Sequence, residues 1–228
     1  MTQQIATTPF GRRPVTLGQI ATRMQVRAAV EAAGQPGSNA SGAINKWTLY
    51  RTLTEIKERL GLSDRSLSVL NALLSFQQEV ALTLPPPSSS EDPSSAGALC
   101  ALVVFPSNKA LSLRAHGMSE STLRRHLAAL AQAGLIERRD SPNGKRFARK
   151  GHAGPDRFVD AFGFDLTPLV ARAPEFDAIA EELRAQRREL RLSKERVTLH
   201  RRDIAKLIAC GVDEGVVGPW DAFSSRFM

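Results

Sequence analysis

Leucine and isoleucine recur at helical spacing after Lys46, in a pattern that predicts two consecutive helices. The first apolar stripe has steps of four, three and four residues and consists of Leu49, Leu53, Ile56 and Leu60. Gly61 is expected to end this helix. Ser63 is a good N-cap for the second helix, whose stripe consists of Leu67, Leu70 and Leu74. The two stripes predict helices that pack on each other.

A short apolar run and two serine-capped helices are expected next. ALCALVVFP (98–106) predicts a short buried strand. One helix is expected from Ser107 to about Ala115, and Ser119 caps another. The core-facing residues of the second helix are Leu123, Leu127 and Leu130. Because only a tight turn separates them, the two helices have the order of a helix-turn-helix unit.

A basic two-stranded hairpin is expected after Gly134. LIERRD (135–140) has the composition of a strand, SPNG (141–144) has the residues of a tight reversal, and KRFARK (145–150) is expected to return beside LIERRD. Helix, turn, helix and hairpin follow one another as in a winged helix. We therefore predict a mainly α fold: a winged helix-turn-helix domain with N-terminal helices and a long C-terminal helix.

Three segments are expected along the chain. Residues 1–45 are predicted to be a partly ordered basic arm with one helix near Leu17–Ala33. Residues 46–172 are expected to form the winged-helix DNA-binding domain, and residues 173–228 a long helix and tail. Inside the domain, residues 85–97 hold too few apolar side chains to fold, which predicts a mobile loop.

The long helix carries a seven-residue repeat. It is expected to begin near Pro174 and to end before Gly211, and its repeat consists of Phe176, Leu183, Leu190, Val197 and Ile204. The partner positions are polar in the middle, at Gln186, Ser193 and His200, whereas a coiled coil needs both seams apolar. A helix lying along the body or making a weak dimer contact is therefore favoured over an autonomous zipper.

Positive charge is concentrated in the same region as the expected hairpin. The chain has 228 residues and a formal net charge of +8. Between Ser107 and Arg157 there are 11 basic and 4 acidic residues, which is nearly the whole excess. A localised positive field favours a polyanion, since each phosphate neutralised releases counterions. A solubilising face, or a genome rich in arginine codons, would give the same total charge.

The second helix and the hairpin supply the candidate DNA contacts. Hydroxyl groups can donate to phosphates, and an arginine can form two hydrogen bonds with guanine. His126 is expected on the surface or at a phosphate, although an amphipathic surface helix with incidental arginines has the same periodicity. The candidates are Ser121, Thr122, Arg124, Arg125, His126, Arg138, Arg139, Asn143, Lys145, Arg146, Arg149 and Lys150.

Motifs of other classes are absent from the sequence. It has no P-loop, dinucleotide fingerprint or nucleophile elbow, so we expect no enzyme and no cofactor. Cys100 and Cys210 lack metal-ligand spacing and the four histidines are scattered, so we expect no metal and a reducing compartment. Neither a run of 18 apolar residues nor a signal core is present. The expected location is the cytoplasm, with no membrane partner.

Four segments closely resemble the replication initiator protein C (RepC) family of the repABC plasmids of alphaproteobacteria. They are TPFGRRPVTL, LSVLNALLSF, FGFDLTPL and the long stretch LVVFPSNKALSLRAHGMSESTLRRHLAALAQAGLIERRDSPNGKRFARK. The resemblance implies a protein that binds a double-stranded plasmid origin, located within its own gene, and initiates replication there. We also expect host replication proteins as partners and a homodimer on DNA. Family members carry a further C-terminal domain.

The DNA-binding unit by itself leaves other functions open, because a fold does not fix a function. One alternative is a winged-helix transcriptional regulator that acts by promoter occlusion. Another is an adaptor whose basic face binds an acidic protein. An ATPase, nuclease or relaxase would need a cluster of carboxylates or histidines, which the sequence does not supply.

Overall fold

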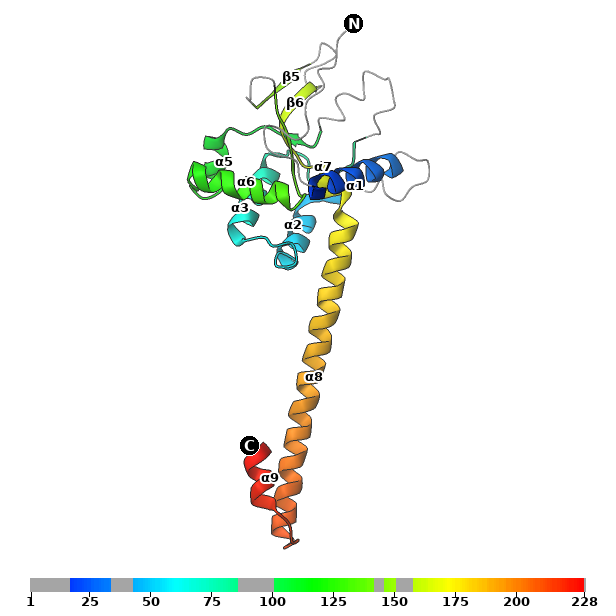
Figure 1. The fold of residues 1–228 in the computed structure, drawn as a ribbon, viewed down its shortest axis with the longest axis vertical. Helices are drawn as coiled ribbons and strands as arrows, with labels where there is room; N and C mark the ends of the chain where they lie inside the picture. Colours follow the sequence, from blue (N-terminus) through cyan, green and yellow to red (C-terminus); the bar gives the residue numbers. More distant parts are fainter. Residues whose placement is uncertain (1–16, 34–42, 86–100, 142–145, 151–157, 228) are drawn as a thin grey trace. The chain divides into compact units, whose positions relative to one another are not determined.

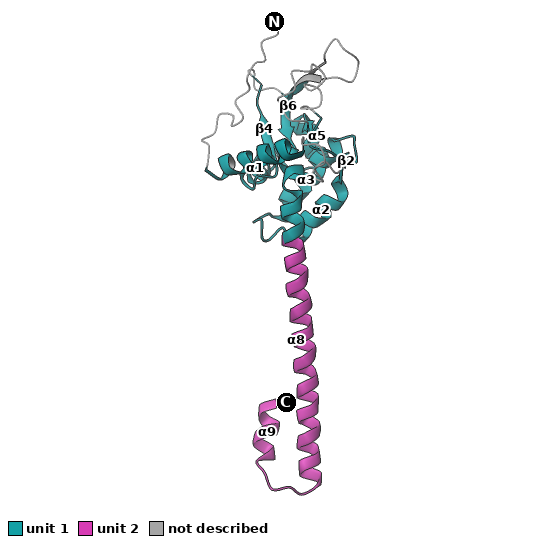
Figure 2. Ribbon diagram, turned by 90° about the vertical axis from the view of Figure 1, so that its right-hand side faces the viewer, with its two compact units in different colours: residues 1–178 teal, residues 179–228 magenta. Residues whose placement is uncertain are grey.

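The computed structural model describes residues 17–33, 43–85, 101–141, 146–150 and 158–227. In these ranges the chain is mainly helical with short strands, as the sequence predicts (Figure 1). The chain divides into two compact units, residues 1–178 and 179–228 (Figure 2). No helix in the described ranges is both long and apolar enough to cross a membrane. Of the expected loop at 85–97, all but Pro85 lies outside these ranges.

The first unit begins with α1 (Leu17–Ala33), which has the predicted bounds. α2 (Lys46–Glu55) directly follows β1 (Ile44–Asn45), which pairs antiparallel with β2 (Ala81–Leu82) further along the chain. The Asn45 side chain caps α2 by accepting hydrogen bonds from the first N–H groups of the helix. α2 is shorter than predicted, because the chain continues in turns from residue 56 to residue 61.

α3 (Asp64–Phe76) confirms the second predicted helix. The hydroxyl oxygen of Ser63 accepts a hydrogen bond of 3.2 Å from the Ser66 N–H, so Ser63 is the N-cap. The stripe along the helix is buried, with Leu67 3% exposed and both Leu70 and Leu74 fully covered. This helix is the surface against which later elements pack.

α5 (Asn108–Arg114) and α6 (Glu120–Gln132) confirm the two serine-capped helices. Both pack on α3 and on each other. The core-facing positions of α6 are buried as predicted, at Leu123, Leu127 and Leu130. The strand expected at 98–106 is shorter in the described part of the chain, where β3 covers only Val103–Val104.

The strands of the larger sheet are joined through β6 (Phe158–Asp165). β6 pairs antiparallel with β3, with β4 (Glu137–Arg139) and with β5 (Phe147–Lys150). Because β4 and β5 both run antiparallel to β6, they run parallel to each other. The predicted hairpin of LIERRD with KRFARK is therefore wrong.

The register along β6 shows where the chain reverses instead. Gly163 pairs with Arg139 of β4, and the preceding Phe162 pairs with Phe147 of β5. The reversal therefore falls between β5 and β6, and the basic ribbon consists of these two strands. Turn residues such as those at 141–144 permit a reversal, but strand direction is set by the partner strand, which lies far away in sequence.

At Gly163 the backbone of β6 lies close to that of β3. A Cβ atom at this position would lie 2.2 Å from the backbone oxygen of Val104. A backbone atom in a sheet cannot move aside as a flexible side chain can, so only glycine fits. The neighbouring Phe162 and Phe164 are both 3% exposed and belong to the core.

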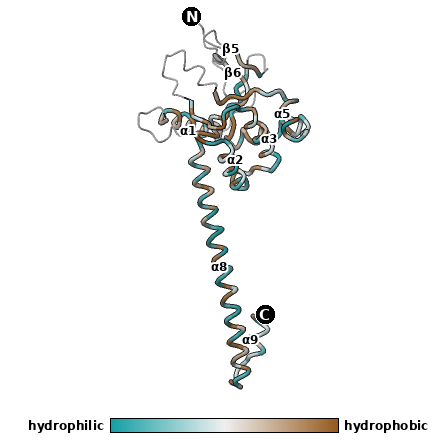
Figure 3. The backbone as a smooth tube through the Cα atoms, turned by 180° about the vertical axis from the view of Figure 1, so that it is seen from behind, coloured by the Kyte–Doolittle hydropathy of each residue, from teal (hydrophilic) through white to brown (hydrophobic). Residues whose placement is uncertain are grey.

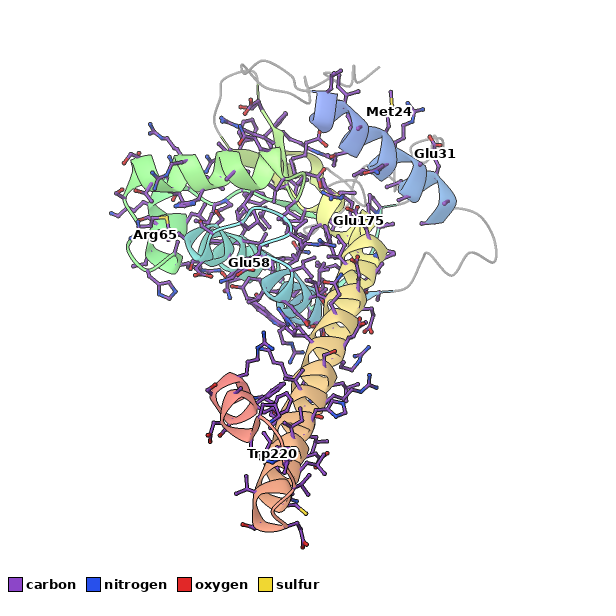
Figure 4. The ribbon with its side chains drawn as sticks, turned by 60° about the horizontal axis from the view of Figure 1, so that its bottom comes forward. Met24, Glu31, Glu58, Arg65, Glu175 and Trp220 are labelled. Atoms are coloured by element: carbon purple, nitrogen blue, oxygen red, sulfur yellow. The ribbon has the colours of Figure 1, made fainter. Side chains whose placement is uncertain are left out.

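His126 lies in the interface between α6 and α3, so its expected surface position is wrong. The residue is 7% exposed, and its Nδ1 lies 3.0 Å from the Ser66 hydroxyl oxygen. Its Nε2 is buried without a hydrogen-bond partner in the described structure. Burial lowers the pKa of His126, and the positive charges of Arg125 and of Arg65 at the start of α3 (Figure 4) lower it further.

Arg172 connects the end of α6 to the start of the next long helix. Its Nη1 donates to the carbonyl oxygens of Ala133 and Gly134 at 2.8 and 3.1 Å, which otherwise lack helical partners. The same guanidinium forms two hydrogen bonds with Glu175. Arg172 follows the short helix α7 (Thr167–Ala171), which packs against α1.

α8 (Ala173–Asp213) is the predicted long helix. It continues through Gly211 rather than ending before it. A Cβ atom there would lie 2.6 Å from the indole of Trp220, in a helix that the sequence did not predict, α9 (Trp220–Phe227) (Figure 4). The left-handed residue that follows the end of α8 is Gly215, with φ of +64°.

The seven-residue repeat of α8 is covered only in part. Leu190 and Val197 are 56% and 58% exposed, whereas Ile204, which lies on the same side of the helix, is half-buried. α9 is joined to α8 near this point by a hydrogen bond of 3.2 Å from Arg201 to the Phe227 carbonyl oxygen. A dimer contact through the exposed part of the repeat stays a prediction.

Replacing Gly163 with alanine is expected to destabilise the first unit by about 1–3 kcal/mol, because the added methyl group would overlap a backbone oxygen. Gly18→Ala is the matched control. A Cβ atom at Gly18 would have nothing within 4 Å, and alanine is the better helix former. Urea unfolding of both variants measures the difference. Equal stabilities would contradict the close approach of β6 to β3.

Acidification is expected to weaken the packing of α6 on α3 through His126. Since its folded-state pKa lies below the unfolded value, the unfolded chain takes up the proton first, and stability falls as the pH drops through about 6.5 and below. His126→Gln removes this titration. The difference in unfolding free energy between wild type and variant should therefore shrink from pH 7.5 to pH 5.5. A difference that grew on acidification would mean that the pKa is raised.

Candidate nucleic-acid interface

The turn between α5 and α6 is held by backbone geometry that suits a tight reversal. His116 and Gly117 both have positive φ, at 60° and 72°, and the Gly117 N–H donates to the Ser112 carbonyl oxygen at 2.9 Å. The Ser119 hydroxyl oxygen then accepts a hydrogen bond from the Thr122 N–H. The start of α6 is thereby fixed relative to α5.

One side of α6 faces away from the core and combines small residues with arginines. Ser121, Arg124, Arg125 and Gln132 are exposed, and Thr122, Ala128 and Ala129 are half-buried. This is the outward face that the spacing of the leucines predicts. Small side chains allow the helix backbone to approach a groove, and the hydroxyl groups near its N-terminus can donate to phosphates.

The two arginines on this face differ in their existing partners. Arg124 forms an ion pair of 2.8 Å with Glu120, one turn earlier on the same helix. Arg125 makes no hydrogen bond or ion pair within the described part of the chain. A guanidinium group without a competing partner can bind an incoming base edge or phosphate without first breaking a contact, so Arg125 is the best placed of the candidates.

Two predicted contacts on β4 are engaged in ion pairs. Arg138 pairs with Asp140 at 2.6 Å and keeps half of its side chain exposed. Arg139 pairs at 2.6 Å with the buried Asp165, which also accepts a hydrogen bond from the Thr167 N–H. Arg139 therefore satisfies a buried carboxylate at the end of β6, a role that the sequence did not reveal.

Arg146 is also held by contacts within the fold and is not free on an open surface. Its Nη1 donates to the Pro106 carbonyl oxygen and to Oδ1 of Asn108, each at 3.0 Å. The guanidinium lies over the Phe164 ring at 4.4 Å, and burial lowers its pKa, although an arginine stays protonated. Arg146 thus anchors the residue before β5 to the start of α5.

The remaining candidates are placed only in part. Arg149 and Lys150 lie in β5, paired with β6. Asn143 and Lys145 lie outside the described residues. His126, Arg139 and Arg146 are engaged in internal contacts, and Arg138 lies on β4. The other described candidates thus lie on two elements, α6 and the β5–β6 ribbon.

Arg172 helps to position this surface, and the sequence did not indicate it. It caps the carboxyl end of α6 from a distance of nearly forty residues, so no local pattern indicates it. For the buried position of His126 a signal did exist, because it lies three residues after Leu123 and four before Leu130, on the buried side of the helix. In the described ranges no group of three His, Cys, Asp or Glu residues could hold a metal ion.

Residues 13–212 match the family model of the replication protein C N-terminal domain. Two relatives bear the name "Putative replication protein C". The protein from Sinorhizobium fredii (strain NBRC 101917 / NGR234) is 48% identical over 97% of this chain and 48% of its own length. The protein from Rhizobium rhizogenes is 44% identical over 97% of this chain and 49% of its own length.

This chain therefore spans about half the length of the curated relatives that it matches. No solved structure is similar to it. The family match covers most of the chain and agrees with both relatives, which confirms the resemblance found in the sequence. The chain belongs to the replication protein C family and corresponds to its N-terminal domain.

Proposed function

We propose that this chain binds double-stranded DNA sequence-specifically at a plasmid replication origin and initiates plasmid replication there. In this proposal α5 and α6 are a helix-turn-helix unit, β5 and β6 are its wing, and α6 is the recognition helix. The observation that carries the proposal is Arg125, which stands exposed and unpaired on a face of small residues, on the second helix of a tightly joined pair.

The two surfaces, on α6 and on the β5–β6 ribbon, would make different kinds of contact with DNA. The N-terminal part of α6 would enter the major groove, where Arg125 can donate two hydrogen bonds to guanine. Ser121 and Thr122 would bind phosphates, and the ribbon that carries Arg149 and Lys150 would contact the backbone or the minor groove beside the helix. Phosphate contacts fix the register, and base contacts select the sequence.

Binding and deformation of DNA would be the whole mechanism of this domain. We propose no catalytic step and no cofactor for it. Bound DNA would become a platform for the host's replication proteins, and two copies on one site would increase the deformation. The supporting feature is the packing of α6 on α3, which makes the binding helix part of a rigid core that can impose a shape on DNA.

Selection of bound fragments from the parent plasmid, followed by footprinting, tests the proposal. Protection within the coding region of this protein, tighter than on random DNA, is the expected result. Protection no better than on random DNA would refute sequence-specific origin binding. A plasmid-maintenance assay separates initiation from promoter occlusion, since a repressor would leave replication to another protein.

Arg125→Ala is expected to weaken specific binding by about 1–3 kcal/mol and non-specific binding by less, because one base contact is lost. Its melting temperature should stay unchanged, since the side chain is exposed and unpaired. Arg139→Ala is the matched control, expected to lower the melting temperature because Asp165 loses its ion pair. Binding of both DNAs and thermal unfolding are measured for each variant. An unchanged specific-to-random ratio in Arg125→Ala would make Arg125 a phosphate contact.

Affinity for DNA is expected to depend strongly on salt. If α6 and the ribbon together neutralise about six phosphates, log K should fall against log salt with a slope of about −5 or steeper. Fluorescence anisotropy from 50 to 300 mM salt, roughly the range in which counterion release is measured, provides the slope. A flat response would show that a basic face is not the interface.

A further inference from the structure

A strip of basic side chains runs along the middle of α8, outside the proposed DNA-binding surfaces. From Arg184 to Arg202 there are eight basic and two acidic residues, an excess of six positive charges. All residues from Ala185 to Asp203 are exposed. The helix is coloured largely hydrophilic in Figure 3, with hydrophobic positions interspersed.

The basic residues are collected on one side of the helix. At about 100° per residue, seven of the eight project within an arc of about 140°, and the rise of about 1.5 Å per residue spreads them over about 27 Å. We call these seven the α8 strip: Arg184, Arg187, Arg188, Arg191, Lys194, Arg201 and Arg202. Arg196 lies on the opposite side, about 180° from Arg187.

Three of the seven charges of the strip have no partner in the described structure, whereas Arg187 and Arg201 make contacts, as do Arg184 and Arg191. Arg184 pairs with Glu181 at 2.6 Å, and Arg191 approaches Glu195 only to 3.7 Å. The side chains of Arg188, Lys194 and Arg202 have no hydrogen bond or ion pair in the described structure. Like charges three and four residues apart destabilise an isolated helix. A polyanion bound along the strip would remove this repulsion.

The shape and chemistry of the strip favour a nucleic-acid backbone. A length of about 27 Å approaches one turn of B-form DNA, about 34 Å. Six of the seven residues are arginine, whose planar fork matches phosphate oxygens better than the ammonium of lysine. A membrane surface would require one continuous apolar face, whereas the side of α8 opposite the strip carries Glu189, Arg196 and Asp203.

We propose that the α8 strip is a second, sequence-independent binding surface for the phosphate backbone of double-stranded DNA. This inference rests on the proposed function of the first unit and adds contacts to it. Because phosphates carry no base identity, the strip should raise affinity for every sequence by a similar factor and leave the choice of site to α6.

A matched pair of variants tests the position of the strip. Arg187→Gln and Arg196→Gln remove the same charge from exposed positions on opposite sides of one helix. The probes are a plasmid fragment that carries the coding region of this protein and a random duplex of the same length. Arg187→Gln should make the slope of log K against log salt shallower by about one for both probes, and Arg196→Gln should leave it unchanged.

The triple variant Arg187→Gln, Arg191→Gln, Lys194→Gln tests the size of the effect. Its slope should be shallower than that of wild type by about three, with the ratio of specific to random affinity unchanged. Far-UV circular dichroism checks that α8 keeps its helical content; glutamine is a good helix former, so a loss of helix is not expected.

The outcomes separate this inference from the proposed function. A wild-type chain with no salt-dependent DNA binding would overturn both. A wild-type chain that binds DNA, together with a triple variant of the same slope, would overturn the strip alone. Equal changes from Arg187→Gln and Arg196→Gln would mean that only net charge matters, which also overturns it. Binding of polyglutamate as tight as that of DNA, lost in the triple variant, would assign the strip to an acidic protein instead.

Discussion

The sheet of the first unit depends on the close approach of β6 to β3 at Gly163. β6 pairs with β3, β4 and β5 in the described structure, so each of these strands is oriented by it. At Gly163 the Val104 carbonyl oxygen occupies the space of a side chain. The ribbon and the strand that precedes α5 are thereby tied to a common element. The proposed wing is connected to the α5–α6 pair through β6, because β3 precedes α5, β4 follows α6, and both strands pair with β6.

Arginine has two distinct roles in this unit, and its partners distinguish them. Arg139, Arg146 and Arg172 each satisfy oxygens that the fold would otherwise leave unpaired: a buried carboxylate, a loop carbonyl, and the carbonyls that end α6. An unsatisfied buried acceptor costs about 1–3 kcal/mol, more when it is charged. These side chains are therefore not available to a ligand without loss of stability, whereas Arg125 is.

Local signals in the sequence predicted the helices well, because caps and apolar stripes act within a few residues. Ser63, Ser107 and Ser119 cap the helices as expected. The strand directions were not predictable in the same way. SPNG has turn residues, but β4 and β5 both take β6 as their partner, and a partner strand further along the chain leaves no trace in a turn motif. His126 was misplaced because a polar residue type was given more weight than its position beside Leu130.

The candidate site, like the strands, was predicted only in part. Counting basic residues located a positive region but overstated its free charge, since Arg138, Arg139 and Arg124 each have a carboxylate within 2.8 Å. On α8 the net count is similar, with carboxylates beside Arg184 and Arg191 and no partner for the side chains of Arg188, Lys194 and Arg202 in the described structure, although the sequence analysis concentrated on its leucines. A seven-residue apolar repeat and a basic strip can share one helix, because at about 100° per residue Leu190, Val197 and Ile204 project just beyond one edge of the strip's arc, by about 20°, 40° and 60°. Free positive charge, rather than total positive charge, is the quantity that indicates a phosphate-binding surface.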